Sequence, residues 1–140
     1  MMVTAIAFDF GARSIGVAYG QSLTGTGREL PPLKARDGVP DWRAVATLLA
    51  EWRPRQLVVG LPLSMEGDDQ EMTARAQRFG RQLEGRFGIN TDMVDERLTT
   101  REAWQVAIDS GEYHSKPEID SLAAVLITES WLRNRPKDSA

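Results

Sequence analysis

The chain has 140 residues, of which 41% are hydrophobic and 26% are charged, and its formal net charge is −3. This composition is typical of a globular protein with one substantial core, and the length is too short for two lobes. The absence of cysteine excludes disulfides and thiolate zinc sites, and the negative charge argues against a protein that coats nucleic acid by bulk attraction. We expect one domain over residues 1–134 and a polar tail over residues 135–140.

Export and membrane signals are not evident in the sequence. No basic region precedes the first apolar run, and Asp9 interrupts that run, so we expect no signal peptide. No apolar stretch approaches the roughly 20 residues that a membrane-spanning helix needs. We therefore expect a cytoplasmic protein without a membrane partner.

The segment IAFDFGARSIGVAY, which begins at Ile6, predicts two strands joined by a tight turn. An apolar run ends at Asp9, Gly11 and Arg13 lie in the turn, and a second apolar run follows. A carboxylate buried beside apolar neighbours is costly unless a cation compensates its charge. The partner of Asp9 is therefore either Arg13 or a divalent metal ion, and the segment alone leaves both open.

Alternating strand and helix patterns follow along the chain. The expected elements are an edge strand over 28–36 with Pro31 and Pro32, a turn at Asp37-Gly38, a helix over 42–52 between its cap Asp41 and Pro54, a strand over 57–59, a helix from the capping box of Asp68 and Glu71 to Phe87, a strand over 91–94, a helix from Thr99 to Gly111, and a helix from Ser115 to about Arg133. The last helix is apolar on nearly every side, which is typical of a helix buried against a sheet. This order predicts an α/β fold with a mixed five-stranded sheet and helices on both faces.

The expected helix that ends at Phe87 carries four arginines off its apolar stripe. They are Arg75, Arg78, Arg81 and Arg86. Such a row is either a solvated face or a basic rim for nucleic acid, and the sequence leaves both interpretations open.

Three acids stand at the ends of expected elements: Asp9 after the first strand, Glu96 after the last strand and Asp120 in the first turn of the last helix. Functional groups collect at strand ends in α/β sheets. Converging carboxylates repel one another unless cations lie between them, and oxygen-only ligands suit Mg²⁺ or Mn²⁺. Two such ions can activate water for attack on a phosphodiester. Each acid alone also has a structural explanation, such as the helix dipole for Asp120 or an ion pair with Arg97 for Glu96.

Other chemistries have little support in the residue inventory. The single histidine, His114, lies in a polar segment without a second ligand beside it, and either a proton relay or simple exposure accounts for it. Without cysteine or a second histidine, zinc hydrolysis and Cys–His catalysis are unsupported. The chain contains no Walker-type phosphate loop.

Four motifs in order resemble the YqgF family, also called RuvX. They are DFGARSIGVAYG from Asp9, VVGLPLSMEGDDQEMTARAQRF from Val58, VDERLTTREA from Val94 and IDSLAAVLIT from Ile119. The resemblance covers the chain from about Thr4 to Trp131. Members of this family are RNase H-like proteins described as Holliday junction resolvases and as pre-16S rRNA nucleases.

The resemblance implies an RNase H-like fold in which Asp9, Glu96 and Asp120 are the catalytic, metal-binding acids. It also implies substrate contacts, which are Gly11, Arg13, Arg97 and Lys116. Gly11 would let the backbone approach the substrate. Related resolvases place an acid at the end of the central strand, where this chain has Gly60-Leu61-Pro62. The second acid would then come from Glu96 on another strand.

The leading functional hypothesis is a metal-dependent endonuclease of the two-metal type, which uses Mg²⁺ or Mn²⁺ to process pre-16S rRNA during ribosome biogenesis. The alternative is a Holliday junction resolvase, for which a homodimer is favoured because two strands must be cut symmetrically. An RNA-trimming enzyme can be a monomer, and the ribosomal particle is a candidate partner. A non-catalytic nucleic-acid-binding module is a third hypothesis. A sugar kinase or actin-like ATPase is a fourth, although it needs two such lobes.

Overall fold

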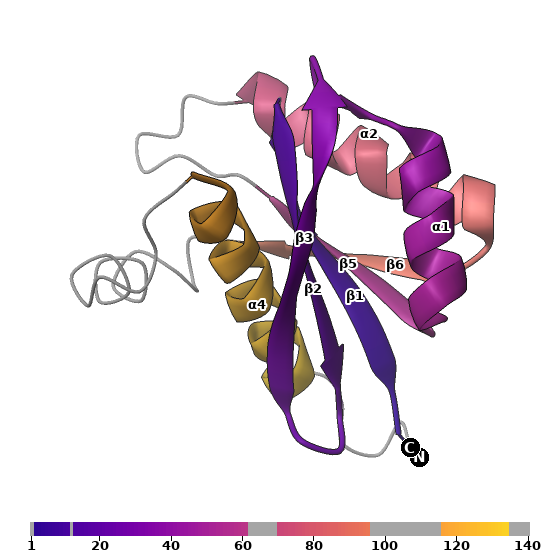
Figure 1. Ribbon diagram of the computed structural model, residues 1–140, viewed down its shortest axis with the longest axis vertical. Helices are drawn as coiled ribbons and strands as arrows, with labels where there is room; N and C mark the ends of the chain where they lie inside the picture. Colours follow the sequence, from indigo (N-terminus) through magenta and orange to yellow (C-terminus); the bar gives the residue numbers. More distant parts are fainter. Residues whose placement is uncertain (1, 12, 62–69, 96–115, 135–140) are drawn as a thin grey trace.

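The computed structural model (Figure 1) describes residues 2–11, 13–61, 70–95 and 116–134, and for residues 61, 70, 95 and 116–122 it describes the backbone alone. The elements are β1 (Thr4–Asp9), β2 (Ser14–Gln21), β3 (Thr26–Arg36), β4 (Val39–Pro40), α1 (Trp42–Trp52), β5 (Gln56–Leu61), α2 (Gln70–Phe87), β6 (Asn90–Asp95) and α4 (Lys116–Asn134). The helix expected over 99–111 lies outside the described residues, as does Asp68 of the expected capping box.

The strands form one mixed sheet in the order β4-β3-β2-β1-β5-β6. β1 runs antiparallel to β2 and parallel to β5, and β5 runs parallel to β6. The antiparallel start and the alternating strands and helices confirm the mixed α/β prediction. The sheet has one strand more than the five expected, because the turn at Asp37 and Gly38 folds the chain back into β4. Both turn residues have positive φ, 55° and 80°, which is the backbone that an Asp-Gly pair favours in a two-residue hairpin.

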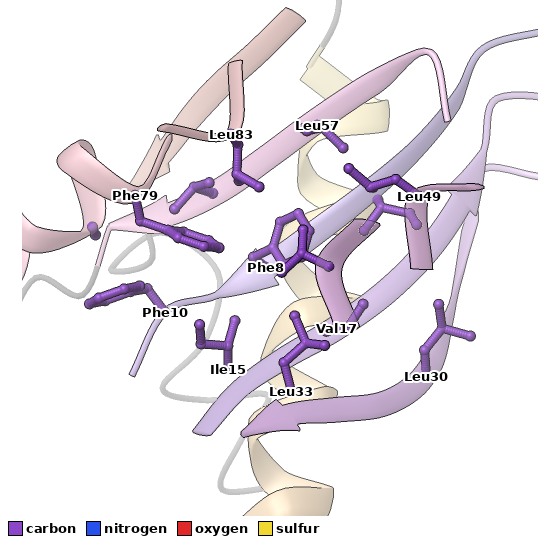
Figure 2. Packing of buried hydrophobic residues seen from close by; sticks show 14 residues of the cluster. Phe8, Phe10, Ile15, Val17, Leu30, Leu33, Leu49, Leu57, Phe79 and Leu83 are labelled. Atoms are coloured by element: carbon purple, nitrogen blue, oxygen red, sulfur yellow. The ribbon is translucent and has the colours of Figure 1, made fainter. Parts of the chain in front are cut away.

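Helices cover both faces of the sheet (Figure 1), with α1 and α2 on one face and α4 on the other. Side chains alternate along a strand, so Ile6 and Phe8 of β1 face α1 and α2, whereas Ala7 faces Ile127 of α4. The larger core lies on the α1–α2 face (Figure 2), where Phe8 packs edge-on against Phe79 at 5.5 Å between ring centroids.

Helix α1 follows the sequence prediction at both ends. The carboxylate of Asp41 accepts a hydrogen bond from the backbone N–H of Arg43 at 3.0 Å, which satisfies one of the free donors of the first turn. At the other end Arg53 adopts a left-handed conformation with φ of 47°, directly before Pro54. The local sequence therefore fixes where α1 begins and ends.

Helix α4 packs against a floor of small residues. Ala5 pairs with Gly20 and Ala7 with Ala18 across β1 and β2, so the sheet presents little more than backbone to the helix. A Cβ atom built on Gly20 would collide with the Cγ2 methyl of Thr128, which shows how closely the helix approaches. This close contact sets the height of α4 above the sheet.

Strand β3 contains the two prolines that the sequence places at a sheet edge. Pro31 and Pro32 fall where the β2–β3 register shifts, between the pairs Ile15–Leu33 and Val17–Leu30. On the outer side of β3, strand β4 pairs only with Ala35 and Arg36. Proline cannot donate to a strand ladder, and the bulge and this mostly unpaired border tolerate the missing donors.

Candidate functional site

Asp9 is the last residue of β1 and stands between two glycines. It pairs with Gly16 of β2 on one side and with Gly60 of β5 on the other. Neither neighbour has a side chain that could cover the carboxylate, and Asp9 is half-buried. Because side chains alternate along β1, Asp9 lies on the same face as Ala7, the face that α4 covers.

The carboxyl ends of three parallel strands meet beside Asp9. Gly60 of β5 pairs with Asp9, Val94 of β6 pairs with Gly60, and Asp95 is the last residue of β6. The next residue in the sequence, Glu96, lies outside the described residues. The register therefore brings the strand end that precedes Glu96 to the same edge of the sheet as Asp9, with the glycine of β5 between them.

Helix α4 begins at that same edge (Figure 1), because it runs opposite to β1. Ile127 packs against Ala7, and Leu132 lies near Gly20, whose partner in β1 is Ala5. Asp120 precedes Ile127 by two turns, roughly 10 Å along the helix axis. Asp9 lies beyond Ala7 by about 7 Å along the strand. The backbone of Asp120 therefore lies at the carboxyl end of β1 and on the face of the sheet that carries Asp9.

The other predicted site residues are described to different extents. Lys116 is the first residue of α4 at this edge, and its side chain lies outside the described part of the chain. Arg97 and His114 fall outside the described residues altogether. Arg13 is exposed, and its backbone carbonyl accepts a hydrogen bond from the N–H of Ala35 at 3.0 Å. Its side-chain role stays a prediction.

Gly11 has a structural reason to be glycine that the sequence did not reveal. A Cβ atom at this position would lie 2.5 Å from the backbone carbonyl oxygen of Ser14, closer than real Cβ contacts allow. The turn between β1 and β2 is therefore too tight for a side chain at Gly11. This constraint holds whether or not a substrate approaches the same backbone.

The donor chemistry at this edge suits a hard cation. Asp9 offers carboxylate oxygens in a place where glycines leave room, and oxygen ligands are those that Mg²⁺ and Mn²⁺ prefer. The described side chains include no cluster of three His, Cys, Asp or Glu residues that could hold a metal by itself. A complete set of ligands would therefore have to include residues beyond these, such as Glu96 and Asp120.

A pocket of about 230 Å³ lies at the same end of β1 but on the α1–α2 face. Its lining includes Phe10, which follows Asp9, together with Trp42 and Phe79. Two arginines of α2, Arg75 and Arg78, complete its polar side. The sequence revealed the arginine row but not the pocket, because the pocket forms only when the β3–β4 turn folds against α2.

Known structures share this arrangement. The structure titled "T. thermophilus RuvC in complex with Holliday junction substrate" matches 94% of this chain and 95% of its own, with a TM-score of 0.57 and 15% sequence identity. At that identity the likeness concerns the fold alone. The sheet order, the helices on both faces and this likeness define an RNase H-like fold of the RuvC type.

Sequence comparison then gives the family. A family model described as "RuvX: Holliday junction resolvase" matches residues 3–134. A protein of Actinobacillus succinogenes named "Putative pre-16S rRNA nuclease" is 50% identical over 139 residues, which cover 98% of this chain and 99% of that protein. A Yersinia enterocolitica protein of the same name is 54% identical over 130 residues, with 91% and 93% covered. The chain belongs to the RuvX family.

None of the helices in the described ranges is both long enough and apolar enough to cross a membrane.

Proposed function

We propose that this chain is a metal-dependent endonuclease that hydrolyses phosphodiester bonds in structured nucleic acid. The observation that carries the proposal is the meeting of element ends at one sheet edge: Asp9 ends β1, Asp95 ends β6 one residue before Glu96, and Asp120 follows the first turn of α4. Membership of the RuvX family supports the same class of reaction.

Asp9, Glu96 and Asp120 would hold Mg²⁺ or Mn²⁺ at this edge. When bound, such ions activate water and stabilise the charge that develops on the scissile phosphate. Asp9 lies on a strand that is paired on both sides, so its backbone position at this edge is fixed by the sheet. Arg97 and Lys116 would offset the charge of the phosphate, and Gly11 and Arg13 would line the approach to it.

The proposed substrate is precursor 16S rRNA, in keeping with the names of the relatives that are about half identical over nearly their full length. A four-way DNA junction is the second candidate, favoured by the description of the family model. The two candidates differ in what they require of the assembly. Symmetric cutting of a junction favours a two-fold dimer, whereas trimming of one RNA strand does not.

The decisive experiment compares the wild-type protein with Asp9→Asn on both substrates. Each protein meets a synthetic 5′ end of precursor 16S rRNA and a four-way DNA junction, in the presence of Mn²⁺, Mg²⁺ or EDTA. We expect metal-dependent RNA cleavage by the wild type and a loss of at least about a hundredfold in the variant, because the amide is a neutral and weaker ligand. Thermal unfolding should be little changed.

The outcomes separate the hypotheses. Cleavage of the junction alone would replace the RNA assignment with the resolvase assignment. Cleavage that persists in Asp9→Asn, or in EDTA, would contradict the metal mechanism. Absence of cleavage on either substrate, with binding retained, would favour the non-catalytic nucleic-acid-binding module.

A further inference from the structure

The pocket on the α1–α2 face has an aromatic floor. Phe10 and Phe79 lie side by side at one end of the buried cluster (Figure 2), with 5.4 Å between their ring centroids. The ring of Trp42 lies 5.9 Å from that of Phe79 and is only half-buried. Phe10 and Phe79 line the pocket but are almost fully buried, with 4% and 2% of their surface exposed, so the half-buried ring of Trp42 is the one that a ligand would contact. Such a floor suits a flat, largely apolar ring.

The volume of the pocket indicates how large that ring system is. Pockets for drug-sized ligands enclose roughly 300–1,000 Å³. The pocket of about 230 Å³ lies below that range and therefore suits one ring system rather than a whole dinucleotide. Polar groups at its rim, the side chains of Asp37 and Gln82, could meet hydrogen-bonding groups at the edge of such a ring.

The two arginines of the pocket have different surroundings. The guanidinium of Arg75 lies 2.8 Å from the carboxylate of Glu71 and 4.0 Å from that of Asp37, so it is held as part of the wall. Arg78 is exposed, and within the described part of the chain it takes part in no ion pair. Its guanidinium is therefore available to a phosphate, which arginine can bind through two parallel hydrogen bonds.

The basic character continues along the same side of α2. The guanidinium of Arg86 lies over the ring of Trp42, 4.2 Å from its centroid. Arg75 and Arg78 thus line the pocket and Arg86 lies over one of its aromatic rings, although the net charge of the protein is negative. The combination of aromatic rings and a basic border is that of a single-stranded nucleic-acid groove.

The pocket and the candidate catalytic edge are joined through consecutive residues. Asp9 faces α4, and Phe10 turns to the opposite face to line the pocket. A strand of nucleic acid held at Asp9 would have to pass only the end of the sheet to reach the pocket.

We propose that this pocket binds one base of a single-stranded segment of the substrate, a few nucleotides from the scissile bond, while Arg78 contacts the adjoining phosphate. The shared ligand chemistry is a base with its phosphate, from either RNA or DNA. The position relative to the scissile bond rests on the proposed nuclease function. The binding itself does not.

The test measures binding without catalysis. A labelled single strand of about ten uridines, within the usual site sizes of single-strand binders, is titrated with the full chain in EDTA and followed by fluorescence anisotropy. The variants are Arg78→Ala and, as a matched control, Arg81→Ala, which removes the same charge from an exposed position of α2 outside the pocket lining. The same titrations are made with the thymidine DNA strand.

We expect Arg78→Ala to weaken binding about five- to tenfold and Arg81→Ala less than about twofold. A larger loss of affinity in Arg78→Ala than in Arg81→Ala supports binding in the pocket, and the strand that shows this difference, RNA or DNA, is the nucleic acid that the pocket binds. Equal losses in the two variants on both strands would reduce the effect to overall charge and overturn the proposal. A change in the sedimentation mass of the free protein in Arg78→Ala would also overturn the proposal, because it would mean that the pocket is an interface between copies of the chain.

Tryptophan fluorescence tests for the base itself. A base in the pocket should quench Trp42, and Trp42→Phe should abolish that quenching while affinity stays within about twofold. Quenching that is undiminished in Trp42→Phe, or equal with an abasic strand, would contradict the proposal. If Arg78→Ala binds more weakly than Arg81→Ala but the wild type cuts neither substrate, the pocket proposal stands and the nuclease proposal fails. If the wild type cuts but the two variants bind alike, the nuclease proposal stands and the pocket proposal fails.

Discussion

Gly11 is the residue at which a structural and a functional explanation can be separated. The Cβ atom of an alanine would lie 2.5 Å from the carbonyl oxygen of Ser14, and a backbone group cannot move aside as a flexible side chain can. We therefore expect Gly11→Ala to lower the free energy of unfolding by about 1–3 kcal/mol. Denaturant titration would measure this change.

The control for this variant is Gly85→Ala. Gly85 lies in α2, and nothing lies within 4 Å of a Cβ atom built on it, so alanine should leave stability unchanged or raise it by up to about 1 kcal/mol. If Gly11→Ala instead unfolds like the wild type and only loses activity, the glycine serves substrate approach and not the turn.

For single residues, the sequence predicted the features that depend on adjacent residues in the chain. Asp9 was predicted at a strand end because the apolar run before it and the glycine after it are local signals. The ion pair between Arg75 and Asp37 was not predictable, because the two residues meet only when a hairpin turn and a helix pack together. The roles of Glu96, Asp120, Arg97 and Lys116 stay predictions.

Among the elements, α4 depends most on small residues in its partner strands. Gly20 of β2 faces Thr128 and Leu132, so Gly20→Ala would place a methyl group against the Cγ2 of Thr128. We expect a loss of about 1–3 kcal/mol from overpacking, seen as a lower midpoint in thermal unfolding.

Thr128→Ser offers a rescue of Gly20→Ala. Serine removes the obstructing methyl group but keeps a hydroxyl, which in the wild type donates to the carbonyl of Ala124 at 2.8 Å. The double variant should therefore recover most of the lost stability. A double variant no more stable than Gly20→Ala would show that the helix is held away from β2 by other contacts.

The elements themselves were largely predictable because their signals are periodic and their ends are marked. α1 matches its expected bounds, since Asp41 and Pro54 act on adjacent backbone. β4 was missed because two residues carry no periodicity and its pairing with β3 is decided by the turn. The pocket was missed for a related reason: its walls come from the residue after β1, the β3–β4 hairpin, α1 and α2.

Over the whole molecule, charge is distributed unevenly. Although the net charge is −3, α2 carries a row of arginines from Arg75 to Arg86. Binding of a single strand at the pocket, beside Arg75 and Arg78, should release counterions and weaken with salt. The slope of log K against log salt should be smaller by about 0.7–1 in Arg78→Ala and unchanged in Arg81→Ala.

Affinity titrations over a series of salt concentrations, in EDTA, give these slopes. Equal slopes in the wild type and Arg78→Ala would mean that Arg78 makes no phosphate contact. Equal reductions in both variants would mean that the strand follows the outer face of α2 rather than the pocket.

The two prolines of β3 have a consequence for how the protein behaves among its own copies. An eleven-residue strand that β4 covers only at Ala35 and Arg36 is a template for another extended chain. Successive N–H groups point to opposite sides of a strand, so consecutive prolines at Pro31 and Pro32 leave this border short of a donor, and their rings obstruct an incoming backbone. The long part of β3 that β4 leaves uncovered is therefore a poor template for a strand from a neighbouring molecule.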